Sequence, residues 1–230
     1  MSSRRGNVTV IIPMKPLAQA KSRLRVPADI RSPRPIPAEF ATAFLADVVR
    51  ATATAQSVSR VLLTSSDLAI ARFAQSHDVD FLFERAEPTM QDAPSSRLNA
   101  AASAAVSAAF DDDGCAYAAV LPGDLAALRS ESVEGTLREA TEVDSSTFVR
   151  DHTGIGTTLL CIARVNHIEP RYGGASGADH LRAGAVDITA SASLDLRLDV
   201  DTWEDLATAS QLGLGTHSQK LLADQAGLFR

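Results

Sequence analysis

Two acidic segments carry the residue types best suited to holding a metal ion. Asp124 follows the apolar run Ala118–Leu121 through a Pro-Gly turn, and Asp199 and Asp201 flank Val200. Mg²⁺ prefers oxygen ligands and is commonly bound by one or two carboxylates together with substrate phosphates. The two segments therefore predict a magnesium site that receives a phosphate-bearing substrate, with Asp124, Asp199 and Asp201 as candidate ligands.

Each acidic segment also has a purely structural interpretation. Asp124 could cap a following helix, and Asp201 precedes Thr202 at a natural helix start. If Leu194–Leu198 is a strand that continues into the acidic segment, Asp199 and Asp201 share one face, where two like charges need a cation or solvent. Asp199 is then the better ligand, and Asp201 is left between ligand and cap.

A basic segment follows the first apolar run of the chain and contains Lys15, Lys21 and Arg23. Lysine offers a point charge and arginine a fork of donors for phosphate oxygens. These cations could hold a nucleoside triphosphate, with Lys15 and Lys21 also stabilising charge on a leaving pyrophosphate. The alternative is a solvated basic loop, and the segment has neither the P-loop nor the GxGxxG pattern.

Two glycine-rich segments, Gly154–Thr158 and Arg171–Gly177, are candidates for holding a second anion. Glycines let backbone N–H groups approach an anion closely, and a helix N-terminus adds a favourable dipole. Thr157 and Ser176 could donate hydrogen bonds to a phosphate or carboxylate. Glycine-rich turns are common, so ordinary turn structure is the alternative.

Strand-like and helix-like runs alternate along the chain and would position these residues. The expected strands are Val8–Ile12, Arg60–Thr64, Val79–Phe83, Tyr117–Leu121, Ser146–Arg150, Gly156–Ala163, Ala185–Thr189 and Leu194–Leu198. The expected helices are Glu39–Ala55, Asp67–His77, Arg97–Phe110, Glu131–Thr141, Ala178–Arg182 and Thr202–Leu212. This alternation predicts a mainly parallel sheet in an α/β fold, with ligands at the carboxyl ends of the strands.

The composition bounds the class of protein. The chain has 230 residues with 45% hydrophobic and 22% charged residues, which is typical of a globular protein. We expect one domain over 1–230, with a core at about 8–212 and a tail at 213–230. The net charge of −6 argues against a nucleic-acid partner.

Targeting and cysteine chemistry add further exclusions. Cys115 and Cys161 are far apart, so neither a zinc site nor a disulfide framework is indicated. The early run Val8–Pro13 is too short for a signal-peptide core, and no stretch approaches the roughly 20 apolar residues of a spanning helix. We expect a cytoplasmic protein without a membrane partner; a homodimer is left open.

Four segments, taken in order, resemble a known family. They are Pro13–Leu24 (PMKPLAQAKSRL), Leu98–Ala101, Pro122–Leu125 and Leu198–Thr202. This ordered set, within about residues 8 to 212, resembles the guanylyltransferases of deazaflavin coenzyme F-420 biosynthesis, called CofC in archaea and FbiD in actinobacteria. The resemblance implies a single-domain nucleotidyltransferase fold of the nucleotide-diphospho-sugar transferase type: Rossmann-like, three-layer α/β/α, with a mainly parallel sheet.

The resemblance also implies a reaction and roles for residues. The family couples GTP to a three-carbon phospho-acid and releases pyrophosphate; phosphoenolpyruvate is the actinobacterial substrate and 2-phospho-L-lactate the archaeal one. The matching positions are Asp124 and Asp199 for Mg²⁺; Thr157, Gly173 and Ser176 for the acid; Lys15, Lys21 and Arg23 for the phosphates; and Asn99 on the guanine side. The alanine-rich composition favours phosphoenolpyruvate.

The sequence departs from the family pattern at two helix starts and leaves two alternatives open. Ala126 and Trp203 stand where many members have proline, and Pro27–Pro37 is unusually rich in proline, so the role of that segment and of the tail is open. Another phosphorylated acceptor is one alternative function, although the LxxGxGxRM-like loop of such enzymes is absent. A non-catalytic nucleotide-binding module is the other.

Overall fold

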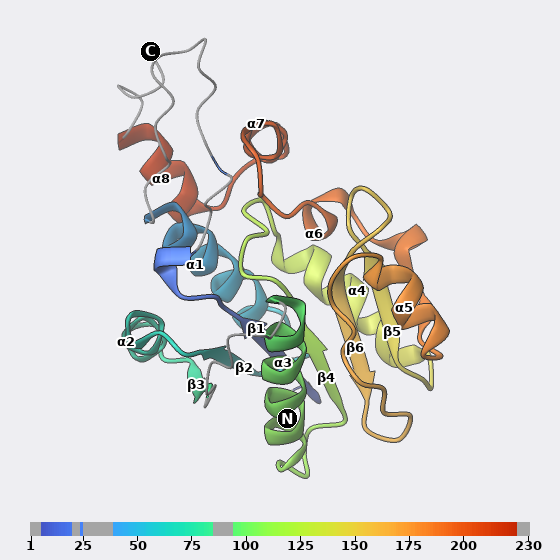
Figure 1. Cartoon of the computed structure of the whole chain (residues 1–230). Helices are drawn as coiled ribbons and strands as arrows, with labels where there is room; N and C mark the ends of the chain where they lie inside the picture. Colours follow the sequence, from blue (N-terminus) through green and yellow to red (C-terminus); the bar gives the residue numbers. More distant parts are fainter. Residues whose placement is uncertain (1–5, 20–23, 25–38, 85–93, 225–230) are drawn as a thin grey trace, which may run out of the picture.

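A seven-stranded sheet lies at the centre of the computed structural model, in the order β3-β2-β1-β4-β6-β5-β7 (Figure 1). The structure describes residues 6–19, 24, 39–84 and 94–224. The strands are β1 Val8–Pro13, β2 Val58–Ser65, β3 Asp80–Phe83, β4 Tyr117–Val120, β5 Thr147–Arg150, β6 Thr157–Ala163 and β7 Val186–Asp187.

The sheet is parallel except at β6. β1 pairs in parallel with β2 on one side and with β4 on the other, with Ile11 opposite Leu62 and Val120. β6 runs antiparallel to both β4 and β5, whereas β7 returns to the parallel direction along β5. The predicted, mainly parallel sheet is therefore confirmed, with one reversed strand between its two halves.

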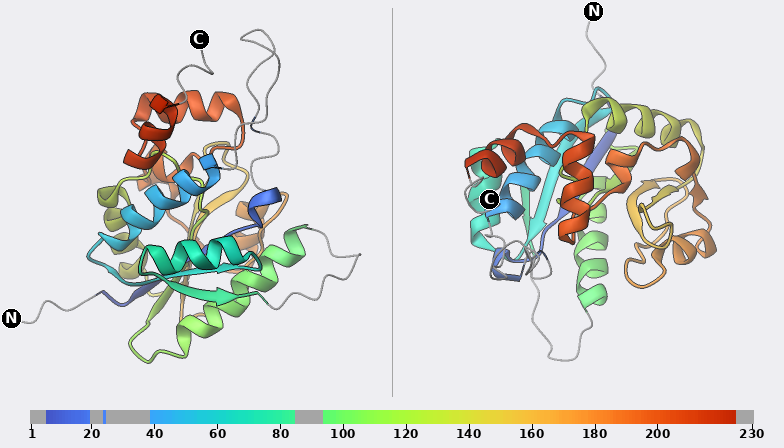
Figure 2. Two further views of the ribbon diagram at one scale, coloured as in Figure 1. Left: turned by 90° about the vertical axis from the view of Figure 1, so that its left-hand side faces the viewer. Right: turned by 90° about the horizontal axis from the view of Figure 1, so that it is seen from above.

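Helices cover both faces of the sheet, as predicted (Figures 1 and 2). They are α1 Glu39–Ala53, α2 Leu68–Ser76, α3 Pro94–Phe110, α4 Ser130–Glu142, α5 Ser176–Arg182, α6 Leu194–Arg197, α7 Trp203–Leu212 and α8 Thr216–Asp224. Two short 3₁₀ helices, η1 Leu17–Gln19 and η2 Thr189–Ser191, lie in loops.

Two hydrophobic clusters separate the faces because side chains alternate along each strand. Val10 and Ile12 of β1 pack with α1, α2 and α4 on one face. Ile11, between them, packs with α3 on the other face, where Ala102, Ala105 and other small side chains let the helix lie close to the strands. β1 is consequently buried on both sides, which explains its uninterrupted apolar run.

A third cluster holds the loops beyond the carboxyl end of the sheet. Phe40 and Phe44 of α1 pack with Ala126, Val200 and the apolar side of α7. Ala126 belongs to the segment after Asp124, and Val200 lies between Asp199 and Asp201. Packing of this cluster therefore holds the two acidic segments together.

The predicted strand at Leu194–Leu198 is wrong. Leu194–Arg197 forms the short helix α6, and Leu198–Val200 continue without regular structure. The alternation of Leu194, Leu196 and Leu198 imitates a strand, but only the latter two leucines are buried, and Asp195 turns inward to accept a hydrogen bond from the Arg129 N–H at 3.0 Å. This long-range contact decides the local structure.

The stretch expected to be a tail contains α8, which lies at the same end of the molecule as α7 (Figures 1 and 2). The buried carboxylate of Asp47 in α1 accepts hydrogen bonds from the N–H groups of His217 and Ser218, at 3.0 and 2.9 Å. Gly215 permits this approach because a Cβ there would lie 2.1 Å from the Asp47 carboxyl carbon. Pro27–Pro37 lies outside the described residues.

Helices long and apolar enough to cross a membrane are absent from the part of the chain that the structure describes.

Candidate active site

Asp124 lies in the turn that follows β4, at the carboxyl end of the central strands. The Val200 N–H donates to the Asp124 carbonyl oxygen at 3.1 Å, so the main chains of the two acidic segments are in direct contact. The capping alternative for Asp124 is wrong, because the next helix, α4, begins at Ser130 with Arg129 as its N-cap.

Gly123 lets the Asp124 turn lie against the loop that follows β1. A Cβ at Gly123 would be 2.4 Å from the Met14 Sδ and 3.2 Å from Leu45 Cδ1. Met14 in turn is held to β2, because its N–H donates to the Thr64 carbonyl oxygen at 2.8 Å. Lys15, which follows Met14, is thus next to the acidic segment and is exposed.

Asp199 lies in an environment that disfavours its charge. Burial, followed by the neighbouring carboxylates of Asp124 and Asp201, raises the pKa of Asp199 to about 6; Asp151 contributes in the same direction. The His152 ring lies close by, with 3.7 Å between its Nδ1 and an Asp199 carboxylate oxygen. We call Asp124, Asp199 and Asp201 the carboxylate side of the candidate site.

Asp201 is exposed, and the cap of α7 is its neighbour Thr202. The Thr202 hydroxyl accepts from the Asp205 N–H at 3.2 Å, and an Asp205 carboxylate oxygen accepts from the Thr202 N–H at 2.8 Å. This capping box confirms the prediction for Thr202 and removes the capping role left open for Asp201. Its role as a metal ligand stays a prediction.

The chemistry of the carboxylate side fits a divalent cation. Asp124 and Asp199 offer hard oxygen donors whose mutual repulsion a cation would relieve. Among the described residues, no three His, Cys, Asp or Glu side chains gather closely enough to hold a metal ion unaided. Two carboxylates completed by substrate phosphates are a usual arrangement for Mg²⁺.

The basic loop is anchored by Asp67. One of its carboxylate oxygens accepts from the Ala69 N–H at 2.8 Å and caps α2, as predicted, while the other accepts from the Leu17 N–H at 2.8 Å. Asp67 therefore holds η1, two residues after Lys15, to the neighbouring helix. Lys21 and Arg23 lie outside the described residues, and their assignment to the phosphates stays a prediction.

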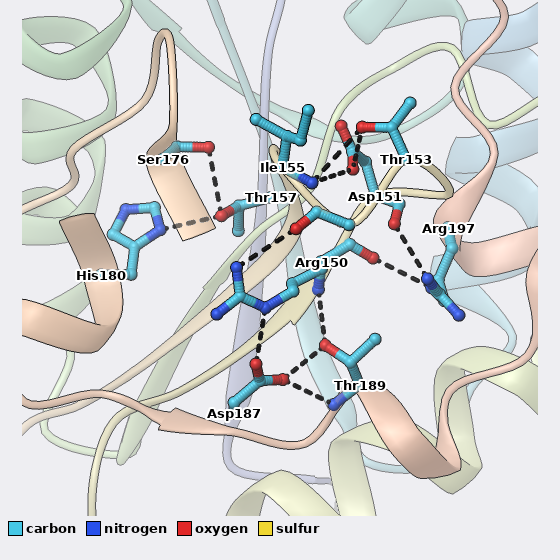
Figure 3. A network of polar contacts seen from close by, with 11 residues as sticks. Arg150, Asp151, Thr153, Ile155, Thr157, Ser176, His180, Asp187, Thr189 and Arg197 are labelled. Carbon is cyan, nitrogen blue, oxygen red and sulfur yellow. Dashed lines mark hydrogen bonds and ion pairs between the residues drawn. The ribbon is translucent and has the colours of Figure 1, made fainter. Parts of the chain in front are cut away.

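Thr157 and Ser176 are brought together at the second glycine-rich segment. The Ser176 hydroxyl lies 3.2 Å from Thr157 Oγ1, and His180 Nδ1 lies 3.0 Å from the same oxygen (Figure 3). Ser176 and His180 are buried and belong to α5, whereas Thr157 begins β6 and is partly exposed. We call Thr157, Ser176 and His180 the hydroxyl side of the candidate site.

Gly173 and Asn99 shape the loop that leads into the hydroxyl side. Gly173 has φ +114°, and a Cβ there would be 2.7 Å from Ser95 Cβ of α3. The Asn99 amide accepts from the Tyr172 N–H at 2.6 Å and donates to the Tyr172 carbonyl oxygen at 3.0 Å. Asn99 thus contacts the loop expected to hold the acid, and its part in nucleotide binding stays a prediction.

The hairpin between β5 and β6 lies between Arg197, which is two residues before Asp199, and the hydroxyl side (Figure 3). Arg197 donates from Nε to the Arg150 carbonyl oxygen at 3.1 Å and from Nη2 to the Asp151 carbonyl oxygen at 3.0 Å. On the opposite flank, the Gly177 N–H donates to the Ile155 carbonyl oxygen at 3.1 Å. One short loop therefore touches the segment before Asp199 and the helix that carries Ser176.

The Arg150 side chain links this hairpin to Asp187 of β7 (Figure 3). Its Nε donates to Asp187 at 2.7 Å and its Nη1 to the Gly154 carbonyl oxygen at 3.2 Å. Gly177 permits the packing, because a Cβ there would be 2.5 Å from Arg150 Nη1.

Sequence reasoning missed His180 and Arg150. Neither has a spacing that signals a site, because their partners are distant along the chain. The only local sign was a histidine shortly after a glycine-rich loop.

Comparison with known proteins gives a consistent family. The model of the family "Guanylyl transferase CofC like" matches residues 8–226. A phosphoenolpyruvate guanylyltransferase of Streptomyces scabiei is 35% identical over 209 residues, which cover 90% of this chain and 92% of the relative. Another, from Geodermatophilus obscurus, is 36% identical over 219 residues, covering 95% of each chain.

Solved structures support the fold. A Desulfovibrio desulfuricans protein assigned to the nucleotide-diphospho-sugar transferases aligns with a TM-score of 0.67 at 16% identity, covering 96% of each chain. A 4-diphosphocytidyl-2C-methyl-D-erythritol synthase aligns with a TM-score of 0.54 at 11% identity, covering 91% of this chain and 99% of that one. The predicted nucleotidyltransferase fold is confirmed, and the family match shows that this chain belongs to the CofC-like guanylyltransferases.

Proposed function

We propose that this enzyme transfers GMP from GTP to the phosphate of phosphoenolpyruvate and releases pyrophosphate, as a step in coenzyme F-420 biosynthesis. The proposal rests on one observation: the hairpin between β5 and β6 contacts Arg197, two residues before Asp199, and also the helix that carries Ser176. The curated relatives named above support phosphoenolpyruvate as the acceptor.

The bond changes need no strong base. An oxygen of the acceptor phosphate, already anionic, attacks the α-phosphorus of GTP and forms the new P–O bond. The bond from the α-phosphorus to the bridging oxygen breaks, and its electron pair leaves with pyrophosphate. Alignment and charge neutralisation are therefore the main demands on the protein.

The residues divide these demands between them. Asp124 and Asp199, with Asp201 as a further candidate, would hold Mg²⁺, which when bound would neutralise charge on the phosphate oxygens. Lys15, together with Lys21 and Arg23, would bind the triphosphate. Thr157, Ser176 and the loop at Gly173 would orient the acid, with Asn99 holding that loop.

The acceptor is tested by mass spectrometry of products. The protein is incubated with GTP and Mg²⁺ and with phosphoenolpyruvate, 2-phospho-L-lactate, a sugar 1-phosphate or no acceptor, while pyrophosphate release is followed. We expect release and a guanylylated product with phosphoenolpyruvate, and less with 2-phospho-L-lactate. Preference for the sugar phosphate would overturn the proposal, and GTP binding without turnover would favour a non-catalytic module.

Replacing GTP with ATP or CTP in the same assay tests the nucleotide. The predicted cytoplasmic location, the absence of nucleic-acid and membrane partners, and the homodimer left open stay predictions.

A further inference from the structure

His180 is fully buried and is hydrogen-bonded at both ring nitrogens. The Arg171 main-chain N–H donates to Nε2 at 2.9 Å, and Nδ1 lies 3.0 Å from Thr157 Oγ1. A main-chain N–H can only donate, so Nε2 must be the acceptor and the proton of the neutral ring must be on Nδ1. The Nδ1–H therefore donates to the Thr157 oxygen.

The surroundings keep the ring neutral. Burial is the main reason that the pKa of His180 falls to about 4; the charge of Arg171 acts in the same direction, and that of Asp179 opposes it. The rings of Phe148 and Tyr172 pack against it, with centroids at 6.0 and 5.4 Å. Burial also raises the pKa of the Tyr172 hydroxyl, so neither aromatic neighbour supplies a charge near neutral pH.

The two hydroxyls beyond His180 can then be counted. Thr157 Oγ1 accepts from His180, and 3.2 Å separates it from the Ser176 hydroxyl, which donates to it. With both lone pairs of Thr157 occupied, its own hydrogen is left to point outward. If the Thr157–Ser176 bond were reversed, the Ser176 hydrogen would be left instead. Either way, the pair keeps one hydrogen for an external acceptor.

We infer that His180 is a positioning residue that fixes the Thr157–Ser176 pair as an outward hydrogen-bond donor to an anionic oxygen of the acceptor. A carboxylate or phosphate oxygen, which can only accept, is the matching partner. The inference rests on the proposed function, because it assigns this pair to the phospho-acid. The hydrogen bonds from the Arg171 N–H to the ring and from the ring to Thr157 form without a ligand. The hydroxyl donor of the Thr157–Ser176 pair is therefore oriented before the acceptor binds.

Two substitutions separate the two contacts of the ring. Asn at 180 can place an amide N–H near the position of Nδ1 but is too short to reach the Arg171 N–H. Gln at 180 can reach the Arg171 N–H but cannot place its donor at the position of Nδ1. We expect His180→Gln to raise the KM for phosphoenolpyruvate about tenfold, the size of one hydrogen bond to a charged group, and His180→Asn to stay within about threefold of the parent.

Thr157→Val completes a double-mutant cycle. If His180 acts through Thr157, His180→Gln should add no further rise in the KM for phosphoenolpyruvate in the Thr157→Val background. The KM for GTP should be the same in all variants. His217→Gln, at an exposed position on α8, is the matched control and should leave both KM values unchanged. Thermal unfolding of each variant reports any loss of fold.

Several outcomes would overturn the inference. One is an equal rise in the KM for phosphoenolpyruvate in His180→Gln and His180→Asn. Another is a full rise in this KM when His180→Gln is added to the Thr157→Val background. Nitrogen-15 NMR of the parent protein at pH 7 gives a test that needs no variant: the His180 ring should be neutral with its proton on Nδ1. A proton on Nε2, or a charged ring, would remove the basis for the positioning role of His180.

Direct binding separates this inference from the proposed function. Calorimetry measures phosphoenolpyruvate binding to the parent, His180→Gln and His180→Asn proteins in the presence of GTP and Ca²⁺. If the parent binds phosphoenolpyruvate with the expected order of affinities but forms no guanylylated product, the proposed function fails and this inference stands. If product forms but the two variants bind equally, the function stands and this inference fails.

Discussion

The carboxylate side and the hydroxyl side differ in how their polar groups are balanced. On the carboxylate side, like charges face one another, and burial and repulsion raise the pKa of Asp199. On the hydroxyl side, both ring nitrogens of His180 have a hydrogen-bond partner, and the side chains of His180, Thr157 and Ser176 are neutral. From this difference we expect that a cation and substrate phosphates complete the first side, whereas the second is organised in advance for an anion.

The largest expected effect comes from removing one charge of the carboxylate pair. Asp199→Asn should lower turnover by about a thousandfold, because a group that neutralises developing charge on phosphate oxygens would be lost. Pyrophosphate release with saturating GTP and phosphoenolpyruvate measures it. Asp144→Asn, at an exposed turn distant in sequence from the site, is the control. Normal Mg²⁺-dependent turnover by Asp199→Asn would remove Asp199 from the site.

A second effect follows from the close approach at Gly123. Gly123→Ala should destabilise the protein by about 1–3 kcal/mol, because the added methyl group meets Met14, Leu45 and Ile12. Urea unfolding measures the loss. Since Met14 Sδ is the nearest atom, the double variant Met14→Ala with Gly123→Ala should recover part of it. No recovery would mean that the contacts with Leu45 and Ile12 dominate.

Asn99 can show which side of the site it serves. Asn99→Ala should raise the KM for phosphoenolpyruvate about fivefold to tenfold, because the Tyr172 loop loses both hydrogen bonds from the amide. The KM for GTP should change less. A rise confined to GTP would instead support the predicted place of Asn99 in nucleotide binding, and would contradict a role through Tyr172.

The smallest effect concerns stability without metal. A carboxyl group with a raised pKa in the folded state stabilises the fold most below its unfolded pKa, and this contribution is lost as pH rises towards about 6. At pH 7.5 in EDTA, the ionised Asp199 carboxylate therefore lowers the stability of the folded state, and Asp199→Asn should raise the Tm.

The expected rise is modest because the Asp199 side chain is 31% exposed, so solvent screens its interactions. We expect roughly 2–4 °C, on the order of 1 kcal/mol for a chain of this size. The difference from the parent should shrink at pH 4, where Asp199 is protonated in the folded state. Calorimetric scans at both pH values measure it, and a lower Tm for the variant at pH 7.5 would show that repulsion does not dominate there.

Much of the architecture was predictable from local patterns. The apolar run of β1, the Asp67 cap of α2 and the Thr202 cap of α7 are short-range signals, and the structure confirms them. The prediction at Leu194–Leu198 was wrong because a period-two pattern over few residues cannot outweigh the contact between Asp195 and Arg129.

The sequence by itself determined the types of group available to the candidate site: carboxylates after β4 and before α7, a basic segment after β1, and hydroxyls within glycine-rich turns. Only the tertiary structure decided which groups meet. His180 reaches Thr157, Asn99 reaches Tyr172, and the main chain of Val200 reaches Asp124, across long separations in sequence. Local propensity depends on near neighbours, whereas these contacts arise from strand order and helix packing.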